Sequence, residues 1–160
     1  MGGKYSHGGG MTEMTAAQIY AVMLEARFPA DKEYSPGVSV AVCLTAIALR
    51  ESGGPGAVAG NPNAFNGNTV TGDRSYGLLQ INLRDVDVDR ALLASGLIHG
   101  AGGAVDETLL FDPLVNAKAG HLLWSGNNAF IDLLWYVTRP GYREAYESHL
   151  PAALAAAQSA

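Results

Sequence analysis

Apolar residues recur at helical spacing soon after the start of the chain. The stretch Thr15-Ala16-Ala17-Gln18 has the composition of a helix-capping box, and four apolar residues follow it on one helical face. These four are Ile19, Val22, Met23 and Ala26. The pattern predicts an amphipathic helix that begins near Thr15 and ends before Pro29, because proline has no N–H to donate to a helix.

A second segment, residues 38–49, holds no charge, and its apolar residues lie on all sides of a helix. Ser35-Pro36 stands ahead of it and offers an N-cap residue followed by a proline suited to a first helical turn. The segment predicts a buried central helix from Ser35 to about Glu51. Ser52-Gly53-Gly54-Pro55 would then end that helix.

Start and stop signals predict four more helices, over about residues 85–95, 112–125 and 128–137 and from Pro151 onward. Residues 52–74, rich in glycine and asparagine, are expected to form a long loop, and residues 76–83 a short strand or irregular ribbon. The predicted fold class is mainly α, or α+β with a small irregular strand region. One domain would cover residues 15–160, after a flexible leader of residues 1–14.

Composition narrows the classes of function. With 160 residues, 48% of them hydrophobic, the chain can bury one core but not two. The net charge of −5 and the lack of a basic stripe argue against nucleic-acid binding. No apolar run reaches about 18 residues and no signal peptide is recognisable, so we expect no membrane association.

Metal and thiol chemistry find little support in the sequence. The four histidines are far apart, and Asp85-Val86-Asp87-Val88-Asp89 lacks the glycine and the distal glutamate of a calcium loop. That acidic string also suits the first turn of a helix. The single cysteine, Cys43, lies within the apolar segment, where we expect it to pack as a small hydrophobe. We predict neither a metal nor a cofactor.

Glu51 is the most informative acid of the chain because it lies at the end of the uncharged segment. Partial burial and the negative end of a helix both disfavour the carboxylate anion, so we expect a raised pKa. A carboxylic acid that stays protonated near neutral pH is suited to protonate a glycosidic oxygen. The alternative is a helix-end glutamate that pairs with Arg50 or with a loop group.

Two further motifs give Glu51 a context. Gly77-Leu78-Leu79-Gln80 and the stretch Asp112-Pro113-Leu114-Val115-Asn116-Ala117-Lys118-Ala119-Gly120 follow Glu51-Ser52-Gly53-Gly54 in that order. Together the three resemble the lysozyme-like superfamily, in particular the soluble lytic transglycosylase domain and its phage lysin and tail relatives. The resemblance covers about residues 35–150, and Leu79 stands where the family usually has methionine.

The C-terminal part departs from the usual transglycosylase pattern. The Tyr-Asn-Ala-Gly string of these enzymes is missing, and Trp135-Tyr136 followed by Gly141-Tyr142 looks more like the ending of phage lysin and tail lysozyme domains. Tyr136 is the candidate for the tyrosine that supports the acid. Trp135 could stack on a sugar, or it could pack in the core.

The resemblance implies cleavage of the β-1,4 bond between N-acetylmuramic acid and N-acetylglucosamine in peptidoglycan, without a cofactor. Glu51 would protonate the leaving oxygen and then act as a base, and the 2-acetamido group of the substrate would stabilise the intermediate that closes to a 1,6-anhydro ring. The expected substrate-binding residues are Ser75, Tyr76, Gly77, Gln80, Asn82, Trp135 and Tyr136. The asparagines of the predicted loop, Asn61, Asn63, Asn66 and Asn68, also suit sugar hydroxyls and acetamides, although asparagine is common in turns.

Asp73 leaves two alternatives open. As a second acid it would assist a hydrolytic muramidase, whereas as a turn residue it would pair with Arg74 or with backbone amides. A third reading is a phage tail or baseplate component that mainly binds glycan. The expected partners are peptidoglycan strands and phage tail or baseplate proteins, and the expected location is a virion or the bacterial cell wall.

Overall fold

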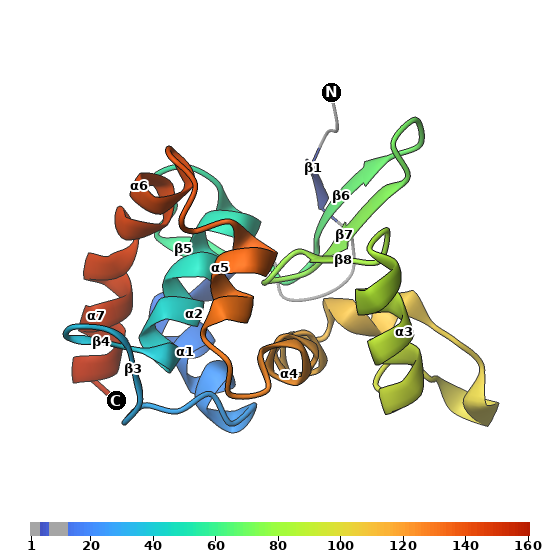
Figure 1. Ribbon diagram of the computed structural model, residues 1–160, viewed down its shortest axis with the longest axis horizontal. Helices are drawn as coiled ribbons and strands as arrows, with labels where there is room; N and C mark the ends of the chain where they lie inside the picture. The colour runs from blue at the N-terminus through green and yellow to red at the C-terminus, as the bar shows by residue number, and fades with distance from the viewer. Residues whose placement is uncertain (1–3, 7–12) are drawn as a thin grey trace.

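The computed structural model describes residues 4–6 and 13–160, which form an α+β fold (Figure 1). Helix α2 (Val40–Ala48) lies at the centre of the core, and all nine of its residues are buried. It packs against α1 (Ala16–Glu25) and α7 (Leu150–Gln158), which were both predicted. The absence of a polar face explains why this helix takes the central place.

The start of α2 differs from the prediction. Its N-cap is Ser39, whose hydroxyl accepts a hydrogen bond from the Val42 N–H at 3.2 Å. Ser35 instead ends strand β3 (Glu33–Ser35), which pairs with β4 (Val38–Ser39) across a turn at Pro36-Gly37. Gly37 has φ +75°, and a proline followed by a residue with positive φ is the sequence of a tight turn rather than of a helix start.

The segment expected to be a long loop contains a β-hairpin. Strands β6 (Ala64–Asn68) and β7 (Asp73–Tyr76) are antiparallel, with Asn66 opposite Ser75. Strand β8 (Ile81–Asn82) pairs with β7 on the other side. The Asn68 side chain accepts hydrogen bonds from the N–H groups of Val70 and Thr71, so asparagine here forms the turn between two strands.

The expected flexible leader also differs in part. Strand β1 (Lys4–Ser6) pairs with β6 and gives the sheet the order β1-β6-β7-β8. Strand β2 (Met14–Thr15) pairs with β5 (Ala59–Gly60). Both pairings join the start of the chain to partners at least 44 residues away, which no local sequence signal encodes. The rest of the predicted leader, residues 1–3 and 7–12, lies outside the described residues.

The helices of the second half follow their caps closely. Helix α3 (Val86–Ser95) has Asp85 as its N-cap and Gly96 as its left-handed stop, and α4 (Pro113–Trp124) has Asp112 as its N-cap. Helix α5 (Ala129–Trp135) ends two residues before the predicted end, because Tyr136 is left-handed with φ +53°. Helix α6 (Tyr142–Glu147) and the 3-10 turns η2 (Ala101–Gly103) and η3 (Glu107–Phe111) were not predicted.

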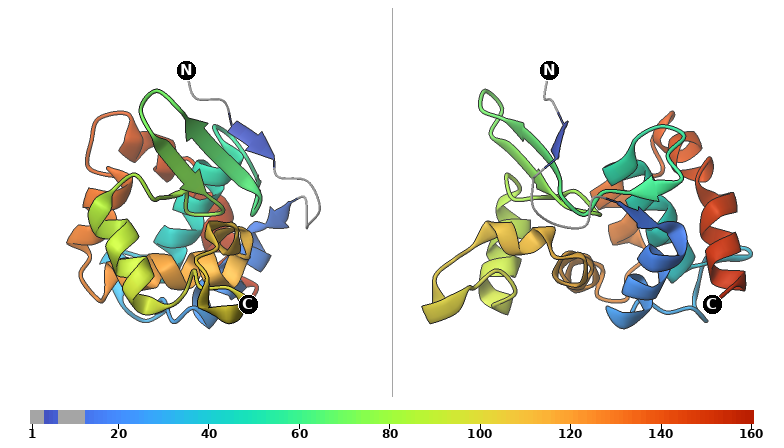
Figure 2. Two further views of the ribbon diagram at one scale, coloured as in Figure 1. Left: turned by 90° about the vertical axis from the view of Figure 1, so that its right-hand side faces the viewer. Right: turned by 180° about the vertical axis from the view of Figure 1, so that it is seen from behind.

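Figures 1 and 2 show how these elements are arranged. Helices α1, α2, α5, α6 and α7 form one side of the molecule, the β6–β8 sheet and α3 form the other, and α4 lies between them (Figure 1). No helix among the described residues is long and apolar enough to cross a membrane.

Candidate active site

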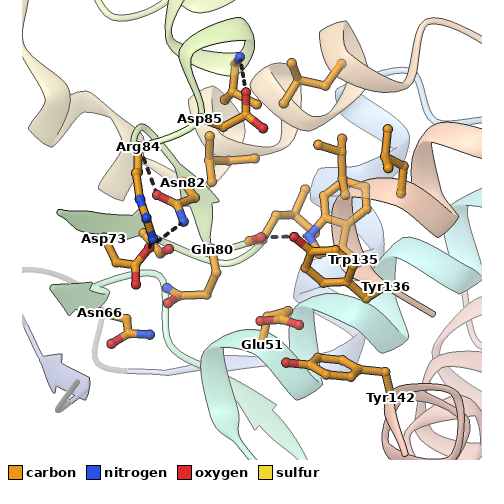
Figure 3. A pocket seen from close by; sticks show the side chains of 17 residues that line it. Glu51, Asn66, Asp73, Gln80, Asn82, Arg84, Asp85, Trp135, Tyr136 and Tyr142 are labelled. Carbon is orange, nitrogen blue, oxygen red and sulfur yellow. Dashed lines mark hydrogen bonds and ion pairs between the residues drawn. The ribbon is translucent and has the colours of Figure 1, made fainter. Parts of the chain in front are cut away.

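A cavity of about 530 Å³ separates two unlike walls (Figure 3). One wall belongs to the sheet and the start of α3, and its polar residues are Asn66, Asp73, Ser75, Gln80, Asn82, Arg84 and Asp85. The other wall belongs to α5 and the chain that follows it, and its residues include Leu133, Leu134, Trp135, Tyr136 and Tyr142. Glu51 lies between the two walls (Figure 3).

Glu51 lies in a π-helical turn, η1 (Leu49–Gly53), that directly continues α2. Such turns are rare and frequently occur at functional sites. The turn fits closely against strand β5 and the chain before it. A Cβ at Gly53 would lie 2.4 Å from the Ala59 carbonyl oxygen, and one at Gly60 would lie 2.8 Å from the Ser52 hydroxyl. Glycine at these two positions therefore allows the turn that carries Glu51 to pack where it does.

Ser52 fixes this turn with two hydrogen bonds. Its buried hydroxyl donates to the Ala48 carbonyl at 2.7 Å and accepts from the Asn61 N–H at 3.0 Å. The first bond holds the turn to the end of α2, and the second holds it to the chain that leads into the β6–β7 hairpin. Ser52 thus links the helix that carries Glu51 to the sheet that forms the opposite wall.

Ser52→Ala should therefore lower the free energy of unfolding by about 1–3 kcal/mol, because it leaves the partly buried Asn61 N–H without its acceptor. Thermal denaturation measures this loss. Ser148→Ala is the matched control, since the Ser148 hydroxyl also bonds a carbonyl of its own helix, at 2.7 Å, but is exposed. Equal melting temperatures for the two variants would contradict the linking role of Ser52.

The Gly77–Gln80 and Asp112–Gly120 motifs meet through Asn116, which is fully buried. Its amide oxygen accepts from the Leu79 N–H at 2.9 Å, and its amide nitrogen donates to the carbonyls of Tyr76 and Leu110 at 2.8 and 2.9 Å. Gly77 has φ +70°, and a Cβ there would lie 2.5 Å from the Asn116 amide nitrogen. Gly77 is thus a packing residue and does not line the cavity, contrary to its expected role in substrate binding.

Gln80 and Trp135 complete the region around Glu51. The Gln80 amide nitrogen donates to the carbonyls of Ala64 and Gly77, at 3.1 and 2.9 Å, which holds the side chain at the end of the β7–β8 connection. The Trp135 indole N–H donates to the Leu79 carbonyl at 2.9 Å. Trp135 is therefore a core residue, only 6% exposed, that also forms part of the cavity wall.

Tyr76 does not line the cavity, so its expected place as a cleft wall is wrong. Successive residues of a strand point to opposite faces, and Asp73 and Ser75 of β7 both line the cavity. Tyr76 therefore turns into the core, where its ring packs between Phe65 and Phe111 with centroid distances of 5.0 and 5.4 Å. Its hydroxyl donates to Glu107 at 2.7 Å, and burial together with this bond raises the pKa of Tyr76 above its ordinary value.

Asp73 lines the cavity within a hydrogen-bond network, although it does not pair with Arg74. It accepts from the Thr71 hydroxyl at 2.7 Å and from the Asn82 amide at 3.3 Å, and it forms an ion pair with Arg84 at 3.3 Å. The Thr71 and Asn82 hydrogen bonds and the nearby Arg84 lower the pKa of Asp73. Arg74 points to the other face of β7 and pairs with Glu107 at 2.6 Å.

Four polar residues of the cavity were not among the predicted site residues: Asn66, Arg84, Asp85 and Tyr142. The Asn66 amide oxygen is buried and has no hydrogen-bond partner among the described residues. Asn66 was one of the asparagines noted as suited to sugars, and Tyr142 closes the Gly-x-Tyr ending. Their place in the site depends on the β6–β7 register and on the turn after α5. The sequence therefore indicated suitable residue types but not that these two residues would line the cavity.

No group of three or more histidine, cysteine or acidic side chains within residues 13–160 is arranged to hold a metal ion. No protein-family model, curated protein or solved structure matches this chain. The site must therefore be interpreted from its own chemistry.

Proposed function

We propose that this protein has the lysozyme-like architecture and cleaves the β-1,4 bond between N-acetylmuramic acid and N-acetylglucosamine in peptidoglycan. The observation that carries the proposal is the position of Glu51, at the end of a buried helix and between the two walls of the cavity. The cavity also holds two other carboxylates, Asp73 and Asp85. Asp85 caps α3 through the N–H groups of Asp87 and Val88, and Asp73 bonds Thr71, Asn82 and Arg84.

The two walls suit an amphipathic sugar chain. Pyranose rings have apolar faces that pack on aromatic side chains, and their hydroxyl and acetamide groups pair with amides and carboxylates. Tyr136 and Tyr142 are 41% and 46% exposed, so their rings are accessible to a ligand. The volume of about 530 Å³ lies within the range of small-molecule sites, roughly 300–1,000 Å³.

The proposed reaction is that of a lytic transglycosylase. Protonated Glu51 donates its proton to the glycosidic oxygen as the bond to C1 breaks, and the acetamido oxygen of the muramic acid forms a bond to C1. The Glu51 carboxylate then removes the proton of the C6 hydroxyl, and O6 displaces the acetamido oxygen from C1. The products are a 1,6-anhydro end and a free hydroxyl on the leaving sugar, and Glu51 regains its proton.

Asp73→Asn separates this route from hydrolysis. If the acetamido group stabilises C1, the variant should keep at least about half of the parent's activity, and both proteins should release 1,6-anhydro muropeptides. Mass spectrometry of digests of purified walls checks this, because a hydrolase product is heavier by one water. Asp85→Asn is the matched control, since asparagine caps a helix as well as aspartate does.

Reducing muramic acid ends from the parent protein, together with a large loss in Asp73→Asn but not in Asp85→Asn, would instead establish a muramidase. Asp73 lines the cavity and its pKa is lowered, so it has the charge that this alternative requires. In both cases the place of action is the bacterial cell wall. If neither the parent protein nor Asp73→Asn clears a suspension of purified walls, the third alternative is favoured. In that case the protein binds glycan without cleaving it, as a tail or baseplate component would.

A further inference from the structure

Arg139 lies beside the cavity residues Tyr136 and Tyr142, in the turn between α5 and α6. The turn is closed by the Arg139 N–H, which donates to the Tyr136 carbonyl at 2.9 Å, and by the Tyr142 N–H, which donates to the Arg139 carbonyl at 3.1 Å. Tyr136 and Tyr142 both line the cavity, and their rings are 6.0 Å apart in an edge-to-face arrangement. The backbone therefore places Arg139 between two residues of the aromatic wall.

The guanidinium group of Arg139 stacks on one of these rings. Its central carbon lies 3.9 Å from the centroid of Tyr136. Stacking fixes the plane of the group and leaves its N–H donors directed outward in that plane, where they can pair with a carboxylate. Among residues 13–160, no acidic side chain forms an ion pair with Arg139. The neighbouring Arg143 differs, because Glu147 binds it at 2.8 Å.

The charge of the cavity makes this cation significant. Among residues 13–160, three carboxylates, Glu51, Asp73 and Asp85, line the cavity with one cation, Arg84, which is paired with Asp73. The whole chain carries a net charge of −5. An anionic ligand is repelled by such a surface unless a cation lies where its negative group arrives.

We propose that Arg139, held on the ring of Tyr136, binds a carboxylate carried by the muramic acid unit of the glycan and so makes the site selective for substituted strands. This inference rests on the proposed function. The carboxylate has two possible sources, the peptide stem attached to the lactyl group or the lactyl group itself once the stem is removed. Both present the planar oxygen pair that a guanidinium group recognises.

Binding constants for three soluble ligands test the proposal in the Glu51→Gln background, which prevents turnover. The ligands are glycan strands with stems, strands stripped of stems by an amidase so that the lactyl carboxylate remains, and N-acetylglucosamine oligomers without a carboxylate. Adding Arg139→Gln should weaken binding of the stem-bearing strands about three- to fivefold, the range of an exposed ion pair. It should leave the uncharged oligomers unchanged, and 0.5 M salt should remove the difference, roughly as screening predicts.

Arg143→Gln is the matched control, since it removes a nearby arginine of α6 that is paired with Glu147, and it should change none of the three constants. A loss confined to stem-bearing strands assigns the stem carboxylates, a loss confined to stripped strands assigns the lactyl carboxylate, and a loss on both shows that Arg139 accepts either carboxylate. An equal loss for all three ligands would show that Arg139 only supports Tyr136 and would overturn the proposal, as would no loss at all. If wall lysis by the parent and binding of all ligands were both absent, the proposed function itself would fail.

Discussion

Glu51→Gln should reduce wall lysis by about 100-fold or more while the melting temperature stays within about 2 °C of the parent. The amide keeps the shape of the side chain but cannot donate the proton that the glycosidic oxygen requires. Loss of turbidity of purified walls measures the activity, and calorimetry measures the stability. The large effect follows from the place of Glu51 between the two walls and from its role as the proton donor of the proposed reaction.

Glu25→Gln is the matched control, because Glu25 is also a glutamate at the end of a helix but is exposed and outside the cavity. It should keep full activity. Residual lysis above about a tenth of the parent in Glu51→Gln would remove Glu51 from the mechanism. Asp73 would then be the first acid to reconsider.

Asn116→Ala should lower the free energy of unfolding by about 3 kcal/mol, since it leaves the N–H of Leu79 and the carbonyls of Tyr76 and Leu110 without their partner. For a domain of this size the loss corresponds to about 6–12 °C in melting temperature. Activity should also fall at temperatures where the variant is folded, because the same connection positions Gln80.

Lys118→Ala on the same helix is the control, and it should change stability by less than about 0.5 kcal/mol because Lys118 is exposed. A melting temperature of Asn116→Ala within about 2 °C of the parent would mean that water replaces the three hydrogen bonds and that Asn116 does not hold the two motifs together.

Helix boundaries that depend on local chemistry could be predicted from the sequence. Thr15 caps α1, Asp85 caps α3 and Asp112 caps α4 through side-chain bonds to residues two or three positions on. Ser35 does not cap the helix, because it ends strand β3. Gly37, two residues later, completes the tight turn across which β3 pairs with β4. The capping signals at Thr15, Asp85 and Asp112 predicted helix starts because no other structure competed there. The signal at Ser35 did not, because a β-hairpin formed in place of the helix start.

The site was predictable only in part, for a related reason. Glu51, Asp73, Ser75, Gln80, Asn82, Trp135 and Tyr136 do lie on one cavity. Tyr76 does not, because it points to the face of β7 opposite that of Asp73 and Ser75, and Gly77 does not, because it packs against Asn116 after the end of β7. Asn66 lines the cavity because of the β6–β7 pairing, and Tyr142 because of the turn after α5. The sequence pattern specified neither the strand pairing nor this turn.

The hydrogen bond from Trp135 to the Leu79 carbonyl has a mechanical consequence. It ties α5 directly to the β7–β8 connection through a 2.9 Å contact inside the protein, so we expect these two elements to keep their separation when a ligand binds. Adjustment to a glycan strand must then come from the outer ends of the walls, at the turn between β6 and β7 and at the chain from Tyr136 to Tyr142. The elements beside Glu51 would keep their spacing while the rims adapt, so strands of different substitution would be cut with the same geometry at the scissile bond.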